Sequence, residues 1–202
     1  MSDYRVVGDV DETLRRLLWS QMQFDAEITS VLATEQQISL EPPYKIVTDT
    51  NPNEDTLSLF LYRVAENADM KNRPLQRVGD GRLRQPPLSL NFYYLLTPIT
   101  NLTENDHTLL SKAMQIFYDN AILKGAQLEG SLRTNAEELR IILNPMTLED
   151  LNHLWSSFMR PMRLSVCYEV KVIYIDSERE LTGAEVLRKR LELTQHNGGS
   201  AP

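Results

Sequence analysis

The chain has 202 residues and a formal net charge of −7, with 21 Lys and Arg against 28 Asp and Glu. This acidic balance excludes a nucleic-acid binder that works through its whole surface, because phosphate binding needs an excess of basic side chains. A single cysteine, Cys167, leaves no internal disulfide. No stretch approaches the roughly 20 apolar residues of a membrane helix, and residues 1–10 lack the apolar run of a signal peptide. The composition predicts a soluble, intracellular-type globular protein.

Three main helices are predicted from apolar residues that recur at helical spacing. The first runs over 9–22, the second from Thr103 to a stop at Gly125, and the third from Thr147 to a stop at Pro161. Each start carries an acidic residue three positions after a polar one, a pattern typical of helix caps. The expected capping pairs are Asp9 with Glu12, Thr103 with Asp106, and Thr147 with Asp150. In the third helix we expect five side chains to face inward: Leu148, Leu151, Leu154, Trp155 and Phe158.

Strands are predicted where β-branched and aromatic residues alternate between turn-forming residues. The predicted segments are 38–40, 44–48, 56–64, 88–96, 138–143 and 162–175. In the third of these, Phe60, Tyr62 and Val64 are expected to share one face. In the last, the expected core face is Leu164, Val166, Tyr168, Val170, Val172 and Tyr174. Residues 65–87 are expected to form a long polar connection.

This order of elements predicts an α+β fold with three main helices and a mixed, largely antiparallel sheet of four to five strands. Helices and strands do not alternate regularly, which argues against a doubly wound parallel sheet. We expect one domain over 1–176, followed by an arm and tail over 177–202. Within that tail, Thr182 is a candidate cap of a short helix carrying Leu187 and Leu191.

The reactive side chains of the sequence predict no catalytic, cofactor or metal site. His107, His153 and His196 have no second His or Cys at ligand spacing. Cys167 lies in the middle of a predicted strand, where a structural thiol is expected. The glycine pair at 79–81 has neither the strand-to-helix context nor the following Lys-Ser/Thr of a phosphate loop.

Two charged segments are candidates for interaction surfaces. Residues 1–55 carry 11 acids and 4 bases, whereas residues 71–84 carry five bases and one acid. The second segment is either a solvated loop or a contact with another subunit or partner, since charge complementarity sets register and encounter rate. Its candidate interface residues are Lys71, Arg73, Arg77, Arg82 and Arg84.

The charged segment after Asp176 is either a flexible end or an arm that orders on a partner. Within residues 177–193, the candidate arm residues are Arg179, Leu187, Arg188, Arg190 and Leu191.

An ordered set of short motifs extends over most of the chain. Its later part is Leu143-Asn144-Pro145-Met146-Thr147-Leu148-Glu149-Asp150-Leu151, Leu154-Trp155, Arg163-Leu164-Ser165-Val166 and Tyr168-Glu169-Val170. Its earlier part is Leu59-Phe60-Leu61-Tyr62, Asn72-Arg73-Pro74, Pro86-Pro87-Leu88 and Tyr94-Leu95-Leu96. Over about residues 9–176 this set resembles the cap or tail-terminator family of contractile injection systems, phage-tail-like particles that include the Photorhabdus virulence cassettes and the antifeeding prophage.

The resemblance implies a ring-forming tail-terminator fold of the α/β type, a hexameric ring of this chain, and two protein partners, the inner tube and the sheath. It implies no catalytic residue, no cofactor, no nucleic-acid partner and no direct membrane insertion. The resemblance implies that the protein assembles into a particle in the bacterial cytoplasm. That particle is then either released or kept inside the cell, where partner proteins can attach it to a membrane. The 71–84 loop becomes a candidate subunit or tube contact, and the 177–193 arm a candidate sheath contact.

Two other interpretations remain. Another ring or adaptor component of a phage-like tail would also form oligomers, but its loss would prevent assembly from starting. A small-molecule enzyme or binding domain would require a concave apolar pocket with converging polar groups.

Overall fold

The computed structural model describes residues 4–49, 55–71, 74–77, 82–133, 138–175 and 180–182. Two compact units make up the chain. The first contains residues 1–73 and 87–176, and the second contains residues 74–86 and 177–202.

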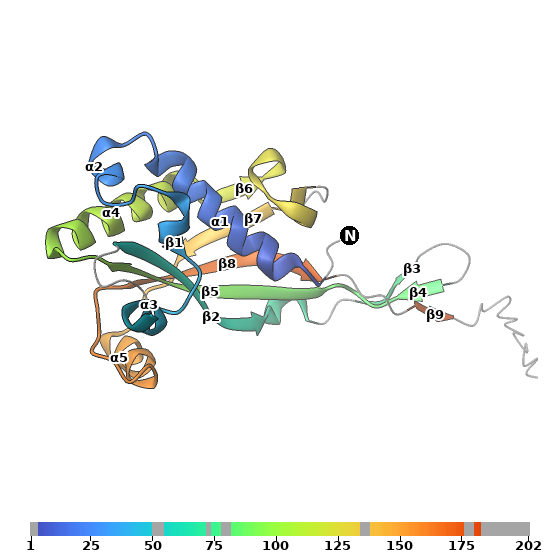
Figure 1. The fold of residues 1–202 in the computed structure, drawn as a ribbon. Coiled ribbons are helices and arrows are strands. Elements are labelled where there is room, and N and C mark those ends of the chain that lie inside the picture. Colours follow the sequence, from blue (N-terminus) through green and yellow to red (C-terminus); the bar gives the residue numbers. More distant parts are fainter. Residues whose placement is uncertain are drawn as a thin grey trace, which may run out of the picture. The chain divides into compact units, whose positions relative to one another are not determined.

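The first unit is built on a six-stranded sheet (Figure 1). In spatial order its strands are β1 (Ile38–Ser39), β2 (Thr56–Glu66), β5 (Leu88–Ile99), β8 (Val166–Ile175), β7 (Glu138–Leu143) and β6 (Ile122–Lys124). All neighbours are antiparallel except β1 and β2, which are parallel. The predicted α+β class and the mixed, largely antiparallel pairing are confirmed. The sheet has one or two strands more than predicted, because the short strand β6 follows directly on a helix and has no period of its own.

Five helices accompany this sheet in the described residues: α1 (Val6–Met22), α2 (Ala26–Thr29), α3 (Pro43–Asp49), α4 (Thr103–Asp119) and α5 (Leu148–Ser157). In Figure 1, α1 and α4 lie on one side of the sheet, and α3 and α5 lie on the other. Short 3₁₀ turns cover Glu35–Gln37, Ala68–Met70, Gly125–Gln127 and Gly130–Arg133. The segment 44–48, predicted as a strand, is helical, since Pro43 occupies the first helical position that its fixed φ suits.

The main core lies between the sheet and the pair α1 and α4. Val10, Leu14 and Leu18 of α1 are buried against Phe92 and Tyr94 of β5. From α4, the buried residues are Leu109, Leu110, Ala113, Ile116 and Phe117. A smaller cluster lies on the other face, where Trp155 of α5 packs with Leu95 and Cys167. Both faces of β5 are therefore covered at this end of the sheet.

Of the three predicted capping pairs, the one at the start of α5 is confirmed and the other two are wrong. The Thr147 hydroxyl accepts a hydrogen bond from the Asp150 N–H at 3.1 Å, as predicted. The Asp9 carboxylate does not cap α1, which begins at Val6, but accepts from the Ser131 N–H at 2.9 Å. The Asp106 carboxylate accepts from Thr100, while Thr103 is already helical. These carboxylates bind neighbouring loops, which local spacing does not indicate.

Several predicted boundaries are wrong for the same reason. Helix α4 ends at Asp119, and Gly125 instead starts a 3₁₀ turn with φ of 61° after strand β6. Helix α5 ends at Ser157, before Pro161. Leu148, predicted to face inward, is 71% exposed; it is the first residue of α5 and lies two turns before the buried Trp155. Tertiary contacts determine these positions more strongly than local pattern does.

Two bulges change which side chains share a face. In β2, a register shift between Leu61 and Arg63 leaves Tyr62 as an extra residue. Arg63 pairs with Tyr93 and Val64 pairs with Phe92, so Val64 leaves the face it was predicted to share with Tyr62.

The second bulge lies between β5 and β8. Leu90 pairs with Ile173 while Phe92 pairs with Val170. Beyond this bulge, Ile173 lies in the core and Tyr174 is opposite Ser89. Tyr174 was predicted on the core face and therefore lies on the other face of the strand. Leu164, also assigned to that face, precedes the strand and is half exposed.

The second unit contains a three-stranded antiparallel sheet in its described residues. Its order is β3 (Gln76–Arg77), β4 (Arg82–Arg84) and β9 (Glu180–Thr182). The predicted connection 65–87 therefore holds two strands, and Thr182, the predicted cap, lies in a strand. Long-range pairing of two segments about 100 residues apart explains why local pattern missed it.

One partly buried acid, Asp11, links stability to pH. The Tyr94 hydroxyl donates to Asp11 Oδ1 at 2.6 Å, and burial raises the pKa of Asp11 above 3.8, with the tyrosine and Arg15 partly opposing it. The folded state thus holds a proton on Asp11 more tightly than the unfolded chain does. As the pH falls through the raised pKa of Asp11, the folded wild type gains stability relative to the unfolded chain. The gain is complete once the pH lies below the ordinary pKa of an aspartic acid in the unfolded chain.

We expect Asp11→Asn to lose this dependence. Melting temperatures of both proteins from pH 7 to pH 4 would show it. As the pH falls, the melting temperature of the wild type should rise relative to that of Asp11→Asn. A difference in melting temperature that does not change with pH would contradict the raised pKa of Asp11.

Candidate interaction surfaces

The predicted basic surface divides between the two units. Lys71 lies in the first unit and forms an ion pair with Glu66 at 3.1 Å. Arg77, Arg82 and Arg84 lie on β3 and β4 of the second unit. Arg73 lies outside the described residues, as do the predicted arm residues Arg179, Leu187, Arg188, Arg190 and Leu191.

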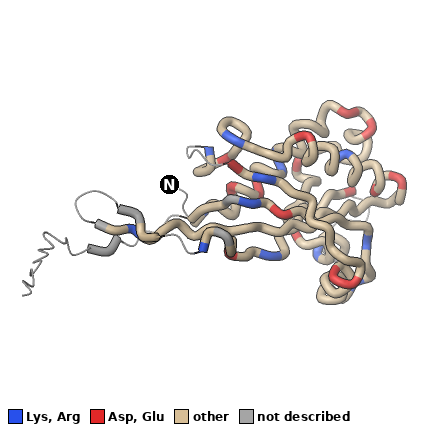
Figure 2. Tube along the Cα trace, turned by 180° about the vertical axis from the view of Figure 1, so that it is seen from behind, with Lys and Arg blue, Asp and Glu red and all other residues tan. Residues whose placement is uncertain are grey.

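The structure joins the two charged segments that the sequence suggested separately. β4 of the basic segment pairs with β9, which begins four residues after Asp176, and Arg84 is opposite Glu180. Acidic and basic residues are interspersed along the first unit in Figure 2, without one acidic and one basic side. The basic segment thus has a local strand partner of its own, and its role as an interface remains a prediction.

A polar network that sequence reasoning missed crosses three strands on the sheet face that carries α5. Glu169 of β8 accepts from the Tyr93 hydroxyl at 2.8 Å and from Asn91 Nδ2 at 3.0 Å. Asn91 in turn accepts from Asn67 Nδ2 at 3.1 Å. The Lys171 ammonium lies 3.2 Å from the other Glu169 oxygen. The Glu169 side chain is only 14% exposed, so these partners replace water.

The bulge in β2 completes this network. It places Arg63 opposite Tyr93, with the guanidinium 5.1 Å from the ring centroid, within range of a cation–π contact. Burial, and then the hydrogen bond and charge of Glu169, raise the pKa of Tyr93. The result is a row of cation, ring, carboxylate and cation across the sheet, whose groups bind one another.

Glu169→Gln should lower the pKa of Tyr93 toward 10.0, because it removes the negative charge that opposes tyrosinate. NMR titration of labelled tyrosine would measure it. Glu138→Gln is the control, since Glu138 pairs with Arg140 and not with Tyr93. An unchanged Tyr93 pKa in Glu169→Gln would contradict the network.

The sulfur-containing cluster under α5 is structural. Met146 Sδ lies 2.9 Å from Cys167 Sγ and 3.5 Å from the Tyr62 hydroxyl oxygen. Burial raises the pKa of the Cys167 thiol to about 11, so the reactive thiolate is scarce near neutral pH. This chemistry agrees with the predicted structural thiol.

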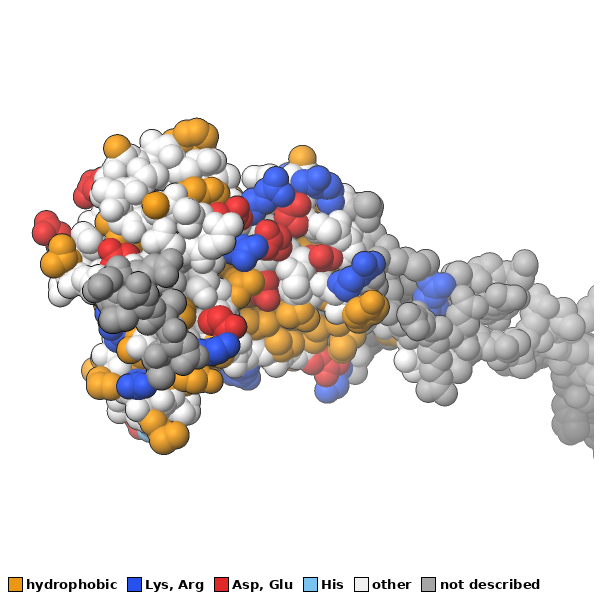
Figure 3. Space-filling view, in the orientation of Figure 1, with side chains coloured by type: hydrophobic (Ala, Val, Ile, Leu, Met, Phe, Trp, Pro, Cys, Tyr) orange, Lys and Arg blue, Asp and Glu red, His pale blue; other side chains and the backbone are white. Residues whose placement is uncertain are grey.

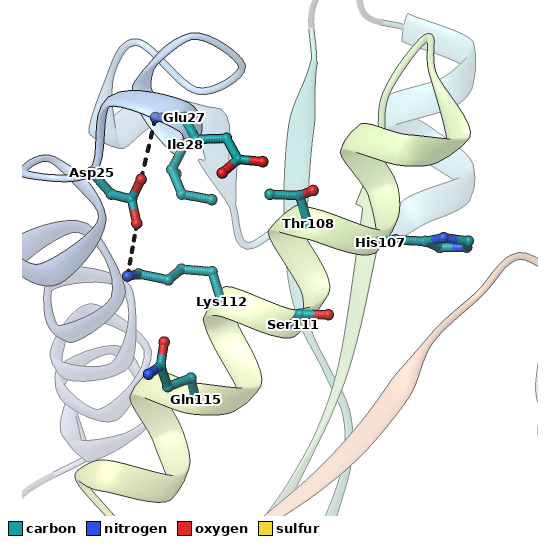
Figure 4. Close-up of a pocket in the computed structure, with 8 residues that line it drawn as sticks. All are labelled: Asp25, Glu27, Ile28, His107, Thr108, Ser111, Lys112 and Gln115. Carbon is teal, nitrogen blue, oxygen red and sulfur yellow. Dashed lines mark hydrogen bonds and ion pairs between the residues drawn. The ribbon is translucent and has the colours of Figure 1, made fainter.

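A shallow cleft of about 520 Å³ lies between α2 and α4 (Figure 4). Asp25 starts α2 by accepting from the Glu27 N–H, and its carboxylate lies 2.8 Å from Lys112 Nζ. The hydrogen bond from Lys112 is the main cause that lowers the pKa of Asp25. Figure 4 shows His107 pointing away from this pair. The ion pair ties α2 to α4 and leaves an open surface rather than an enclosed pocket.

Within the described ranges, no group of three or more His, Cys, Asp or Glu is placed to hold a metal ion. None of the helices described is both long and apolar enough to cross a membrane.

Comparisons with solved structures place this fold among terminators. The sheath and tube terminator of the PVC extracellular contractile injection system, in its extended state, is 17% identical with a TM-score of 0.63. The match covers 99% of this chain and 67% of that one. The tube-terminating cap of the anti-feeding prophage is 18% identical with a TM-score of 0.59, covering 91% of this chain and 61% of that one. This chain therefore spans about two thirds of the length of these relatives.

The fold of this chain is the one that these two terminator structures share. The chain belongs to the Pvc16 N-terminal domain family, whose profile matches residues 9–189. The family resemblance seen in the sequence is thereby confirmed. A comparison with curated protein sequences found no match.

Proposed function

We propose that the protein is the structural cap of a contractile injection particle, closing the distal end of inner tube and sheath. The observation that carries this proposal is the family match over residues 9–189, together with the shared fold of two terminators. The relatives are structural cap proteins, which supports a role without catalysis. Tube and sheath proteins are the proposed partners, and six copies the proposed ring.

The physical task of such a cap is to end a stack. Rings that bind head to tail continue to add until a ring offers no copy of the binding surface on its far side. A cap that holds both cylinders also transmits the displacement of the shortening sheath to the tube. Both tasks require rigid surfaces.

The contacts suggested by charge belong to this proposal. Residues 71–84 are the proposed subunit or tube contact, and residues 177–193 the proposed sheath arm, acting by strand addition. The proposed particle assembles in the bacterial cytoplasm before release or retention. Deletion after Asp176 should leave a folded ring former that attaches poorly to sheath, measured by co-purification. Normal sheath attachment in that truncation would remove the arm assignment.

Deletion of the gene tests the proposal. Negative-stain images should show overlong or uneven particles, with tube and sheath no longer ending together. Complementation with the wild-type chain is the control. Absence of all particles would favour an adaptor that starts assembly, and particles of unchanged length would contradict the cap.

A further inference from the structure

The turn that ends α5 exposes an apolar side chain on a strained backbone. Met159 follows α5 with a φ of 53°, and among the described residues no other residue apart from glycine has a positive φ. In this region the Cβ of an L-residue is crowded, and glycine is the usual occupant. The Met159 side chain is 90% exposed, so little packing within the subunit offsets the strain. Strain that internal packing does not explain points to a role of this side chain at the surface.

Other apolar side chains lie close to Met159 in the sequence. We call residues 158–164 the α5 tip, in which Met162 and Leu164 are each about half exposed. In Figure 3, apolar side chains gather on the surface over α5, at the lower left. The α5 tip also contains Arg160 and Arg163 and no acidic residue. A methionine surface with adjacent cations suits an apolar cavity that lies beside a negative charge.

Such a cavity lies at the C-terminal end of α4. It has a volume of about 140 Å³, and its lining includes Phe117, Tyr118 and Ala121 from the end of α4 and Ile141 and Leu143 from β7. We call this cavity the α4 socket. Cavities of about 150 Å³ hold one group of the size of benzene, so the α4 socket has room for a single methionine side chain. Tyr118, at its rim, is 84% exposed.

A negative charge stands beside the α4 socket. Asp119 is the last residue of α4, whose last turn contains no basic residue. The carbonyl groups at a helix C-terminus are partly negative, so a carboxylate there is unfavourable and a cation is favoured. No described residue forms an ion pair with Asp119. The α5 tip carries the complementary charge, because Arg160 adjoins Met159 just as Asp119 adjoins Tyr118.

The α5 tip and the α4 socket belong to opposite ends of α4. Arg163 of the tip lies 3.5 Å from Asp106, in the first turn of α4. Tyr118 of the socket lies about 18 Å farther along the helix, at 1.5 Å per residue. Helices α4 and α5 also lie on opposite sides of the sheet (Figure 1). A contact between tip and socket therefore joins two copies head to tail, and head-to-tail contacts form a ring when the rotation between copies closes.

We propose that the α5 tip of one copy docks into the α4 socket of the next copy, with Met159 in the cavity and Arg160 beside Asp119. This contact rests on the proposed ring and specifies the surfaces that form it. Docking buries the exposed side chain whose backbone is strained, and it brings a cation to the negative end of α4. Both surfaces belong to this chain, so a second copy is sufficient as the partner.

Met159→Gly separates docking from folding. Glycine adopts the positive φ without strain, so the urea midpoint of the purified chain should stay the same or rise. The amount of the chain in assembled particles, measured by quantitative mass spectrometry, should fall about tenfold or more, because the side chain that fills the socket is gone. Met159→Leu is the matched control, since it keeps an apolar side chain, and its incorporation should stay within about threefold of the wild type. Equal incorporation of Met159→Gly and the wild type would overturn the proposal.

Filling the α4 socket from inside the subunit tests the other surface. Ala121→Phe places a ring in the cavity and should lower incorporation as much as Met159→Gly does. Ala121→Ser leaves the cavity open and is the control, with incorporation like that of the wild type. Combining Ala121→Phe with Met159→Gly should cause no further loss, because both changes remove the same contact. A full further loss in the combined variant would show two separate contacts and overturn the proposal.

Cross-linking in assembled particles identifies the partner. Met159→Cys with Tyr118→Cys on one chain, treated with a short bismaleimide, should give a ladder of covalent oligomers. The wild type is the first control, because its single cysteine is buried. Met159→Cys with Leu88→Cys is the second control and should give no ladder. Leu88 lies about 20 Å along β5 from Tyr94 at 3.4 Å per residue, and Tyr94 pairs with Tyr168 of the socket.

The outcomes separate this contact from the cap proposal. Oligomers formed by Met159→Cys alone would indicate a two-fold contact and overturn the docking of tip into socket. Loss of incorporation in Met159→Gly without a ladder in the cysteine pair would assign the α5 tip to another protein of the particle and would also overturn it. Either result leaves the cap proposal intact. Unchanged particle length in the gene deletion would overturn the cap proposal instead.

Discussion

Replacing Gly130 with alanine should destabilise the fold by about 2–4 kcal/mol. Gly130 has a φ of 55° and begins the 3₁₀ turn Gly130–Arg133, which packs against α1. A Cβ added there would overlap the Asp9 carboxylate. That carboxylate accepts from both the Ser131 N–H and the Ser131 hydroxyl, at 2.9 and 2.6 Å. Moving it aside would break these bonds between the helix and the turn. Urea unfolding at neutral pH measures the change.

Gly125→Ala is the matched control. Gly125 also has positive φ, at 61°, but no atom lies within 4 Å of a Cβ placed there. Only the backbone strain of about 1 kcal/mol is expected. In an Asp9→Ala background the cost of Gly130→Ala should fall to about the same value, because the carboxylate is gone. Equal costs at the two glycines in the wild type would contradict the close contact with Asp9.

Trp155→Ala should cost about 3–5 kcal/mol. Trp155 is 2% exposed and is the largest side chain that holds α5 on the sheet, packing with Leu95, Cys167 and Phe158. Its removal leaves a cavity in the smaller core, where few other side chains can fill the space. Urea unfolding measures the loss, and the NMR signals of α5 should broaden more than those of α1.

Leu148→Ala is the control on the same helix. Leu148 is largely exposed, so its truncation should change stability by less than about 0.5 kcal/mol. A comparable loss in both variants would mean that the Trp155 contact is not what dominates the attachment of α5 to the sheet.

Local sequence patterns predict the long elements of this fold. Strand β7 has the predicted bounds, and α1, β2, β5 and β8 differ only at their ends. These segments bury one side at a regular period, so periodicity carries the information. β6 and β9 are three residues each and exist through pairing with distant strands, which no local pattern records.

The interaction surfaces were harder to predict, for a related reason. Tyr93 and Glu169 lie 76 residues apart and meet because β5 pairs with β8. The bulge that turns Arg63 toward Tyr93 appears in the sequence as regular alternation. Alternation across both faces of β2 is the only signal available, and it gives the wrong face for Val64. Charge counting found the basic segment, but not its pairing with β9.

Locating the chain on intact particles tests the cap proposal most directly. An antibody fragment bound to an epitope tag at the C-terminus can be imaged by electron microscopy on extended and on contracted particles. We predict one ring of label at the end opposite the baseplate, retained on the tube and the sheath after contraction. Label at the baseplate, or repeated along the particle, would contradict the account.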